Sequence, residues 1–287
     1  DGHTISGLYV DYGTSGGVGL FGHVNGGTVR NVTLKDSYVS GSYNVGGICW
    51  YNNGGTVENC TSDCTVKGTG NATGGICGYN DKGSVRNCHN TGKVTGNDYV
   101  GGVCGWNRAN STLEKSYNTG EVSGYQNVGG VCGENDSSTV KGCYNTGMVS
   151  GSYGSYYVGG VCGYNYKTVD GCYNTGNVSG NNYVGGVCGW NGGGTAENCY
   201  YLAGTSANAF GGGNDGTNCA SKTELQFRNG EVAYLLQKDL GGTTQVWGQR
   251  IDPDDTGKTD KTPVLNSTSA YTVHKAAENS PCKRYSN

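Results

Sequence analysis

The sequence predicts an all-β fold, a right-handed parallel β-helix of about seven coils followed by a small α+β cap. The phrase Val-Gly-Gly-Val-Cys-Gly recurs at a period near 28 residues, and Asn-Cys-Tyr-Asn-Thr-Gly follows it about eleven residues later. Each repeat holds three short runs of β-branched, cysteine and aromatic residues, which are typical of strands. Glycine and asparagine separate these runs, and both residues tolerate the left-handed backbone of tight turns.

The cysteines mark the coils in order. Those of the first phrase are Cys49, Cys77, Cys104, Cys132, Cys162 and Cys188, spaced 28, 27, 28, 30 and 26 residues apart. Those of the second phrase are Cys60, Cys88, Cys143, Cys172 and Cys199, with Ser116 in one copy. An earlier copy has Phe21 and Val32 at the two positions, so both positions are predicted to face the core.

Two other repeat architectures fit less well. A β-propeller blade needs roughly 40 to 50 residues, which is more than this repeat offers. Leucine-rich repeats match the period but need ladders of leucine, and the repeats here contain few leucines. A parallel β-helix is therefore predicted for residues 1–203. With parallel strands about 4.8 Å apart, seven coils would form a rod on the order of 35 Å long.

Residues 204–287 are predicted to form the C-terminal cap, because an end coil of a solenoid exposes its core and its strand edges. A helical pattern covers residues 222–238, and Thr223 or Ser221 can cap its N-terminus. Two short strands are predicted at residues 245–251 and 263–265, around a polar loop.

Composition excludes several classes of protein. The formal net charge is −3, whereas a protein that tracks phosphates is expected to carry a basic face, so no nucleic-acid partner is predicted. No stretch of 18 apolar residues occurs, so no membrane span is predicted. The chain begins at Asp1, without an initiator methionine or a signal sequence, which predicts a mature form or a fragment.

The fourteen cysteines have three interpretations. Zinc sites need closely spaced cysteines and usually histidine, a pattern that is missing, so neither a metal nor a cofactor is predicted from them. A ladder of buried free thiols is a second interpretation, because cysteine packs well as a small hydrophobic residue. Disulfides are favoured, because five coils carry both cysteines, although Cα atoms must then lie about 4.4 to 6.8 Å apart. The predicted pairs are Cys49–Cys60, Cys77–Cys88, Cys132–Cys143, Cys162–Cys172, Cys188–Cys199 and Cys219–Cys282, and they imply an extracellular setting.

Carboxylates in the repeats are scattered over different repeat positions, and no nucleophile, zinc-protease or phosphate-loop motif occurs. No catalytic residue is therefore predicted. One acidic loop, with Asp252, Asp254, Asp255 and Asp260, has the carboxylate density of a calcium site but not the spacing of an EF-hand. An exposed polar turn is the alternative.

Tyrosines offer the candidate binding surface. Tyr117, Tyr144, Tyr173 and Tyr200 directly follow the second inward position, so strand alternation turns them outward. A second column holds Tyr99, Asn127, Tyr157 and Tyr183. Such rows can stack on sugar rings or form a protein interface, and the alternative is that they stiffen the rod by stacking on one another.

The repeated blocks resemble GLUG-motif repeats. The residues that carry the resemblance are Gly19-Leu20-Phe21-Gly22, the Val-Gly-Gly-Val-Cys-Gly-x-Asn blocks, and Asn-Cys-Tyr-Asn-Thr-Gly-x-Val-Ser-Gly. GLUG repeats occur in large bacterial cell-surface and secreted proteins, so the resemblance implies an extracellular β-helical stalk or binding module without catalytic residues. The usual Gly-Gly-Leu-Val-Gly is Gly-Gly-Val-Cys-Gly here, which adds a second cysteine to each coil.

Three functions follow as hypotheses. The first is a non-catalytic structural or adhesive module of a bacterial surface protein, which binds a glycan or a host or cell-surface protein. The second is an accessory domain of a surface peptidase or glycosidase whose catalytic domain lies outside this chain. The third is a carbohydrate-active β-helix enzyme. The sequence does not indicate an oligomeric state.

Overall fold

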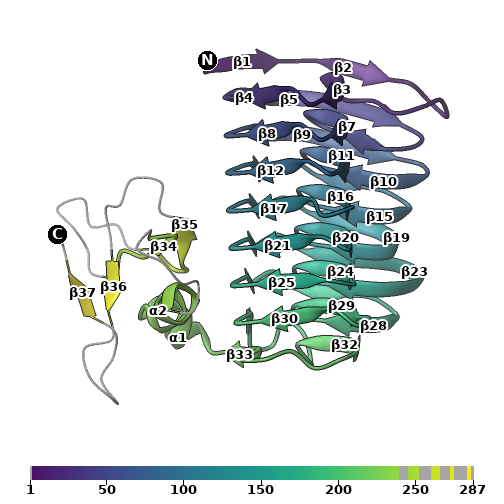
Figure 1. Ribbon diagram of the computed structural model, residues 1–287. Coiled ribbons are helices and arrows are strands. Elements are labelled where there is room, and N and C mark those ends of the chain that lie inside the picture. Colours follow the sequence, from purple (N-terminus) through teal and green to yellow (C-terminus); the bar gives the residue numbers. More distant parts are fainter. Residues whose placement is uncertain (1, 239–244, 252–259, 266–271, 275–282, 286–287) are drawn as a thin grey trace.

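The computed structural model describes residues 2–238, 245–251, 260–265, 272–274 and 283–285. Parallel strands stack coil upon coil into a β-solenoid, as the repeat period predicted (Figure 1). Three sheets run the length of the solenoid, and each coil contributes strands to all three. The C-terminal helices lie beside the solenoid rather than across its end.

The three sheets are defined by their strands. Sheet B holds β3 (Phe21–Asn25), β7 (Cys49–Asn53), β11 (Cys77–Asp81), β16 (Cys104–Arg108), β20 (Cys132–Asp136), β24 (Cys162–Asn165), β29 (Cys188–Asn191) and β32 (Phe210–Gly213). Sheet C holds β4 (Thr28–Arg30), β8 (Thr56–Glu58), β12 (Ser84–Arg86), β17 (Thr112–Glu114), β21 (Thr139–Lys141), β25 (Thr168–Asp170) and β30 (Thr195–Glu197). Sheet A begins with β1 (His3–Ser6), β2 (Tyr9–Asp11), β5 (Val32–Gly41), β6 (Val45–Gly46), β9 (Thr61–Gly68), β10 (Asn71–Gly74), β13 (His89–Asn90), β14 (Val94–Thr95) and β15 (Asp98–Gly101). It continues with β18 (Tyr117–Asn118), β19 (Val122–Gly129), β22 (Tyr144–Asn145), β23 (Val149–Gly159), β26 (Tyr173–Asn174), β27 (Val178–Ser179), β28 (Asn182–Gly185), β31 (Tyr200–Leu202) and β33 (Ala220–Lys222).

Glycine is required where each coil turns from sheet A into sheet B. At the first glycine of the Val-Gly-Gly phrase, an added Cβ would lie 1.9–2.1 Å from the carbonyl oxygen of the cysteine three residues later. Any larger residue would clash with that backbone atom. These positions are Gly46, Gly74, Gly101, Gly129, Gly159 and Gly185. The repeated glycine is therefore explained by close packing of the backbone with itself.

Two columns of buried asparagine run through the interior. In each column the side-chain Nδ2 donates to the Oδ1 of the equivalent asparagine in the next coil, at 2.8–3.0 Å. The first column is Asn52, Asn80, Asn107, Asn135, Asn165 and Asn191, and the second is Asn90, Asn118, Asn145 and Asn174. An amide both donates and accepts, so a stack of identical amides satisfies itself and ties the coils together.

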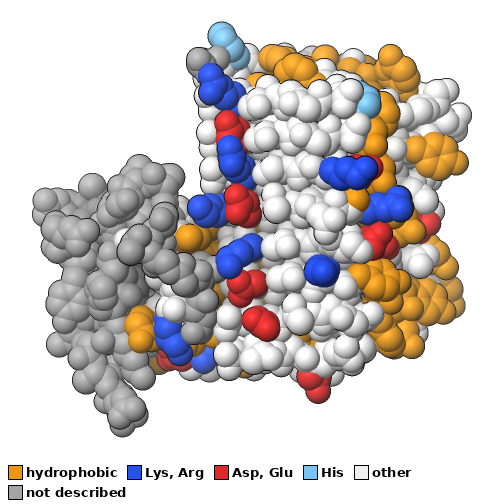
Figure 2. All heavy atoms as spheres, in the orientation of Figure 1, with side chains coloured by type: hydrophobic (Ala, Val, Ile, Leu, Met, Phe, Trp, Pro, Cys, Tyr) orange, Lys and Arg blue, Asp and Glu red, His pale blue; other side chains and the backbone are white. Residues whose placement is uncertain are grey.

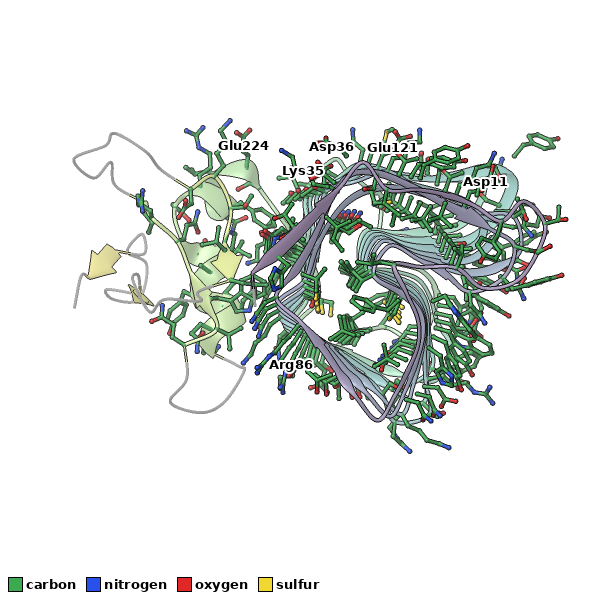
Figure 3. The ribbon with its side chains drawn as sticks, turned by 90° about the horizontal axis from the view of Figure 1, so that it is seen from above. Asp11, Lys35, Asp36, Arg86, Glu121 and Glu224 are labelled. Atoms are coloured by element: carbon green, nitrogen blue, oxygen red, sulfur yellow. The ribbon has the colours of Figure 1, made fainter. Side chains whose placement is uncertain are left out.

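The cysteines form two further columns inside the solenoid, where their sulfur atoms gather in groups when the coils are viewed from above (Figure 3). Twelve of them are buried, and all thirteen described cysteines are free thiols. The five predicted disulfides within coils are therefore not formed in this structure. Cys282, the predicted partner of Cys219, lies outside the described residues.

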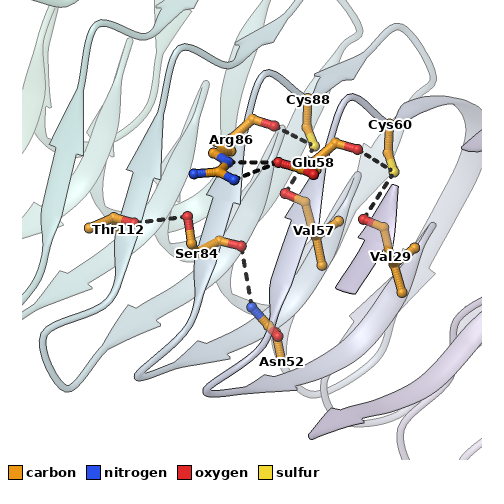
Figure 4. Close-up of polar contacts among 9 residues, drawn as sticks. All are labelled: Val29, Asn52, Val57, Glu58, Cys60, Ser84, Arg86, Cys88 and Thr112. Carbon is orange, nitrogen blue, oxygen red and sulfur yellow. Dashed lines mark hydrogen bonds and ion pairs between the residues drawn. The ribbon is translucent and has the colours of Figure 1, made fainter. Parts of the chain in front are cut away.

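Geometry explains the free thiols. Within a coil, the first cysteine begins a strand of sheet B and the second lies at the corner between sheets C and A, so the two project from different walls of the solenoid. Between coils, in-register parallel strands keep equivalent Cβ atoms near the strand spacing of about 4.8 Å, which exceeds the roughly 3.5–4.5 Å of a disulfide. Thiols of the second column donate instead to backbone carbonyls, as Cys88 does to the Arg86 oxygen at 3.2 Å (Figure 4).

The outer face of sheet C carries a column in which acidic and basic side chains mostly alternate. Figure 2 shows charged side chains of both signs in a column along the solenoid. Arg86 pairs with Glu58 at 2.7 Å (Figure 4), and Lys141 pairs with Asp170 at 3.0 Å. Exposed pairs of this kind contribute about 0–1 kcal/mol each, so their main effect is to avoid like charges in neighbouring coils.

The predicted helix at residues 222–238 is two helices, α1 (Glu224–Arg228) and α2 (Glu231–Lys238). Thr223 caps α1 in a capping box with Gln226, as one of the two predicted caps. Gly230, with φ +85°, separates the two helices. Beyond them, β34 (Trp247–Gly248) pairs antiparallel with β35 (Val264–Leu265), and β36 (Thr272–His274) pairs with β37 (Lys283–Tyr285).

Replacement of one interior asparagine tests the amide column. Asn118→Ala removes bonds to Gly120 and Asn145 and the bond received from Asn90, so we expect a loss of roughly 2–4 kcal/mol in unfolding free energy. Urea unfolding midpoints measure it. Asn53→Ala, which removes only an exposed bond to Asn25, is the matched control and should change stability by less than about 0.5 kcal/mol. Equal effects of the two variants would contradict the structural role of the column.

Alkylation tests the thiol columns. Twelve of the described thiols are buried from solvent and from reagent, so the folded protein should resist labelling at them. Burial also raises the pKa of Cys132, Cys172 and Cys199 well above the ordinary range. In denaturant without reductant, all twelve buried cysteines should be labelled. Mass spectrometry of the digested protein reads out both states, and disulfide-linked peptides from any two of these cysteines would contradict the structure.

Candidate functional site

The tyrosine column predicted to bind ligand is directed away from the coil interior, but it is not a free surface. Tyr117, Tyr144 and Tyr173 stack with ring centroids 4.6 and 4.9 Å apart. Tyr144, Tyr173 and Tyr200 retain 8%, 0% and 4% of their exposure, whereas Tyr117 is half-buried. The prediction that these four side chains form an exposed ligand surface is therefore wrong for three of them.

The C-terminal region covers that column. Phe227, Val232, Leu236 and Trp247 pack with the tyrosines into one apolar cluster. The Tyr173 hydroxyl donates to the Pro263 carbonyl at 2.5 Å, which gives the buried phenol its partner. Strand alternation gave the direction of these rings correctly, but the cap packs along this side of the solenoid.

A different aromatic column lies on the outer face of sheet B. The side chains two positions after Phe21 and after the first cysteine of each later coil stand in register, and they are His23, Tyr51, Tyr79, Trp106, Glu134, Tyr164 and Trp190. Consecutive rings stack: the Tyr51 and Tyr79 centroids are 5.1 Å apart, and those of Tyr79 and Trp106 are 4.9 Å apart. Sheet B therefore presents an almost continuous row of rings.

The second tyrosine column identified in the sequence packs against this row. Its rings contact those of sheet B in three coils: Tyr99 with Trp106 at 5.1 Å, Tyr157 with Tyr164 at 5.0 Å, and Tyr183 with Trp190 at 4.9 Å. We refer to the combined surface as the aromatic face, which comprises Tyr51, Tyr79, Tyr99, Trp106, Asn127, Glu134, Tyr157, Tyr164, Tyr183 and Trp190. Figure 2 shows hydrophobic side chains gathered along the side of the solenoid away from the cap, with charged groups among them.

The backbone at the second column is strained. Tyr99, Tyr157 and Tyr183 have φ values of 55°, 59° and 52°, in the left-handed region that bulky residues rarely adopt. Asn127 occupies the same position with φ 51°, and asparagine accepts this conformation more readily. A strained residue costs on the order of 1–3 kcal/mol and is often found at functional sites. Here, however, Asn44 and Ala72 have φ values of 53° and 59° at the same position of earlier coils, so the strain belongs to the corner of the repeat and does not by itself indicate a site.

One carboxylate interrupts the row of rings. Glu134 stands between Trp106 and Tyr164 in the register and is only 9% exposed. Asn127 Nδ2 donates to Glu134 Oε2 at 2.5 Å. Desolvation by burial raises the pKa of Glu134 to about 7, while the hydrogen bond from Asn127 acts in the opposite direction.

Charged groups border this carboxylate. The Arg108 guanidinium lies 5.1 Å from the Trp106 ring centroid and forms an ion pair with Asp136 at 3.4 Å. Arg108 also donates to the Tyr79 hydroxyl at 3.1 Å. The Trp106 Nε1 and the Asn127 Oδ1 are buried without a hydrogen-bond partner. Two unsatisfied polar atoms thus lie on residues that adjoin Glu134.

Most of the predicted calcium loop lies outside the residues that the structure describes. Asp252, Asp254 and Asp255 lie outside the described residues. The Asp260 carboxylate accepts from the Arg250 amide at 2.6 Å. Within the described part of the chain, no group of three or more His, Cys, Asp or Glu side chains is arranged to hold a metal ion. A helix long and apolar enough to cross a membrane is likewise not found there.

These features define a class: a repeat protein built as a parallel β-solenoid with a ladder of rings on one side. Three segments, residues 41–69, 69–95 and 154–179, match the GLUG motif. These matches and the solenoid fit a GLUG-repeat family of β-helical proteins, which confirms the resemblance seen in the sequence.

A solved structure has a similar fold. It is described as "a putative immunoglobulin A1 protease from Bacteroides ovatus", and it aligns with 93% of this chain and 76% of its own. The TM-score is 0.51 and the sequence identity is 18%, so the similarity concerns the fold. A comparison with curated proteins gives no match.

The row on sheet B was missed by sequence reasoning for a physical reason. Cys77 and Asn80 both face the interior although they are three residues apart, so strict alternation fails on this strand. The change of direction occurs at Gly78, where an added Cβ would lie 2.6 Å from backbone. A glycine directly after the cysteine in most coils was the available signal for this irregularity.

Glu134 makes stability depend on pH. The unfolded chain loses this proton near pH 4.5 and the folded chain near pH 7, so ionisation opposes folding between these values. We expect wild type to lose about 2–3 kcal/mol relative to Glu134→Gln as pH rises from 4.5 to 7. Urea unfolding at several pH values measures the difference. Parallel stability profiles for the two proteins would show that Glu134 titrates at an ordinary pKa.

Proposed function

We propose that the protein is an extracellular β-solenoid module of a bacterial surface protein that binds a linear glycan along the aromatic face. The observation that carries this proposal is the double column of rings, with centroids 4.9–5.1 Å apart across the contacts between Tyr79 and Trp106, Tyr99 and Trp106, and Tyr183 and Trp190. A lattice that repeats at the strand spacing suits a ligand that itself repeats.

The chemistry of the face supports a sugar ligand. Rings bury apolar area at low entropic cost, and phenol and indole groups on their edges hydrogen-bond hydroxyls. Tyr183 of this face is 41% exposed, and Tyr156 and Tyr166, whose rings lie against those of Tyr157 and Tyr164, are 42% and 46% exposed, so the surface is open to solvent. Mixed apolar and polar character over several coils matches an extended polysaccharide better than a small compact ligand.

Binding without hydrolysis is part of the proposal. A glycosidase of the usual kind needs two carboxyl groups on either side of the scissile bond. On the aromatic face, Glu134 stands between two rings, and the nearest acidic neighbour on its strand, Asp136, is held by Arg108. This arrangement favours recognition over acid–base catalysis.

A second role is supported by the fold comparison. The similar solved structure carries the name of a protease, and a GLUG solenoid beside a catalytic domain would act as its accessory module. The aromatic face would then hold the enzyme at its substrate or at the cell surface. Glycan binding by the isolated chain is expected in either role.

Affinity electrophoresis with a panel of soluble linear polysaccharides tests the proposal. Wild type should be retarded by at least one of them, and Trp106→Ala combined with Trp190→Ala should weaken that binding about tenfold, which corresponds to about 1.4 kcal/mol. Tyr12→Ala is the control, because this exposed tyrosine lies outside the aromatic face. Unchanged binding by the double variant, or no retardation of wild type on any polysaccharide, would contradict the proposal.

A further inference from the structure

The row of rings on sheet B has a gap at one coil. Glu134 is the Cα partner of Trp106 on one side and of Tyr164 on the other, so a carboxylate occupies the place of a ring. Because the position is nearly buried, its charge is poorly solvated. Such a group normally has a compensating cation.

Among the described residues, Glu134 forms no ion pair that would supply that cation. Arg108, the basic residue on the neighbouring strand, is paired with Asp136 and bonded to Tyr79. The side chains that shift the pKa of Glu134 are Asn127, Asp136, Cys162 and Arg108. The Glu134 charge in turn raises the pKa of Tyr99 and Tyr164. Asn127 gives a hydrogen bond but no charge. Glu134 therefore has no ion-pair partner of its own among the described residues, and the attraction of Arg108 is shared with Asp136.

The unpaired atoms beside the gap indicate the chemistry of a ligand that would suit it. Asn127, which is 3% exposed, has a free Oδ1 acceptor, and Trp106 has a free Nε1 donor. A primary ammonium has three donors, enough for Glu134 and Asn127 together. Rings at the gap attract a cation through their π faces. The acidic side chains Asp81 and Asp136 outnumber Arg108 on the neighbouring outer positions, which disfavours an acidic sugar.

We propose that Glu134, Asn127 and Trp106 form a subsite for the protonated amine of an amino sugar within the bound glycan. This inference rests on the proposed glycan binding and adds the class of sugar. The ammonium would lie against the Glu134 carboxylate and the Asn127 Oδ1, and the Trp106 Nε1 would donate to an oxygen of the same sugar residue. The remaining rings would hold the flanking sugars.

The subsite predicts a distinct pH dependence. Burial raises the pKa of Glu134 to about 7, and only the ionised carboxylate attracts an ammonium group. A proton therefore competes with the ligand on the acid side, where the amine stays charged. Affinity should fall about tenfold for each pH unit below about pH 6.

A matched pair of oligosaccharides tests the inference: an oligomer of glucosamine and its fully N-acetylated counterpart, which keeps the ring but lacks the charge. Calorimetry at pH 6.5 should show that the glucosamine oligomer binds at least tenfold more tightly than the N-acetylated oligomer. At pH 5 the affinity for the glucosamine oligomer should be much lower than at pH 6.5. Glu134→Gln keeps the shape and the bond from Asn127, so it should fold and bind both oligomers equally, without the pH dependence.

The outcomes separate this inference from the proposed function. Equal binding of both oligomers by wild type would overturn the amino-sugar subsite and leave glycan binding in place. Binding of neither oligomer, together with none of the polysaccharide panel, would overturn both. Binding of a lysine-rich peptide in place of the glucosamine oligomer, abolished by Glu134→Gln, would assign the carboxylate to a protein partner and overturn the sugar ligand.

Discussion

The in-register stacking of parallel coils is the constraint on which the rest of the structure depends. Because each residue lies beside its own equivalents, as Cys77 lies between Cys49 and Cys104, every position becomes a column. A side chain is tolerated only if it can neighbour a copy of itself or a suitable partner. Amides satisfy one another, rings stack, and charges on sheet C pair where their signs alternate. The repeat sequence thus consists of residues whose side chains can stack on identical or complementary side chains in the neighbouring coils.

Cysteine fits the same rule as a small apolar group rather than as a bridge. Its thiol stacks without charge, and its one donor finds a carbonyl two residues away, as at Cys60 and Cys199. Parallel register keeps neighbouring Cβ atoms too far apart for an easy disulfide. The joint presence of two cysteines in five coils, which favoured disulfides, is instead a consequence of stacking, and the columns brace the coils through packing and hydrogen bonds.

Sequence and structure agree on the repeat and on the start of the first C-terminal helix. The period predicted the solenoid, and Thr223 was one of the two predicted caps of α1. Long-range packing could not be predicted. Tyr173 was placed outward correctly, but only the fold shows that Phe227 and Trp247 cover it. The turn at Gly78 reverses the facing of the following residues, so the row containing Tyr79 was hidden from an argument based on alternation.

Among the residues that depart from their columns, Ser116 and Glu134 can be compared to show why one of them suggests function. Ser116 replaces a cysteine and repairs itself, since its hydroxyl accepts from the Cys88 amide and donates to the Glu114 carbonyl. Glu134 replaces a ring and introduces a charge whose burial opposes folding, while Trp106 and Asn127 keep unpaired atoms beside it. The row of rings on sheet B therefore gains no stability from having Glu134 in place of a ring. Glu134 weakens the fold and leaves hydrogen-bonding atoms unused beside it. Selection for binding a ligand explains such a residue better than selection for stability does.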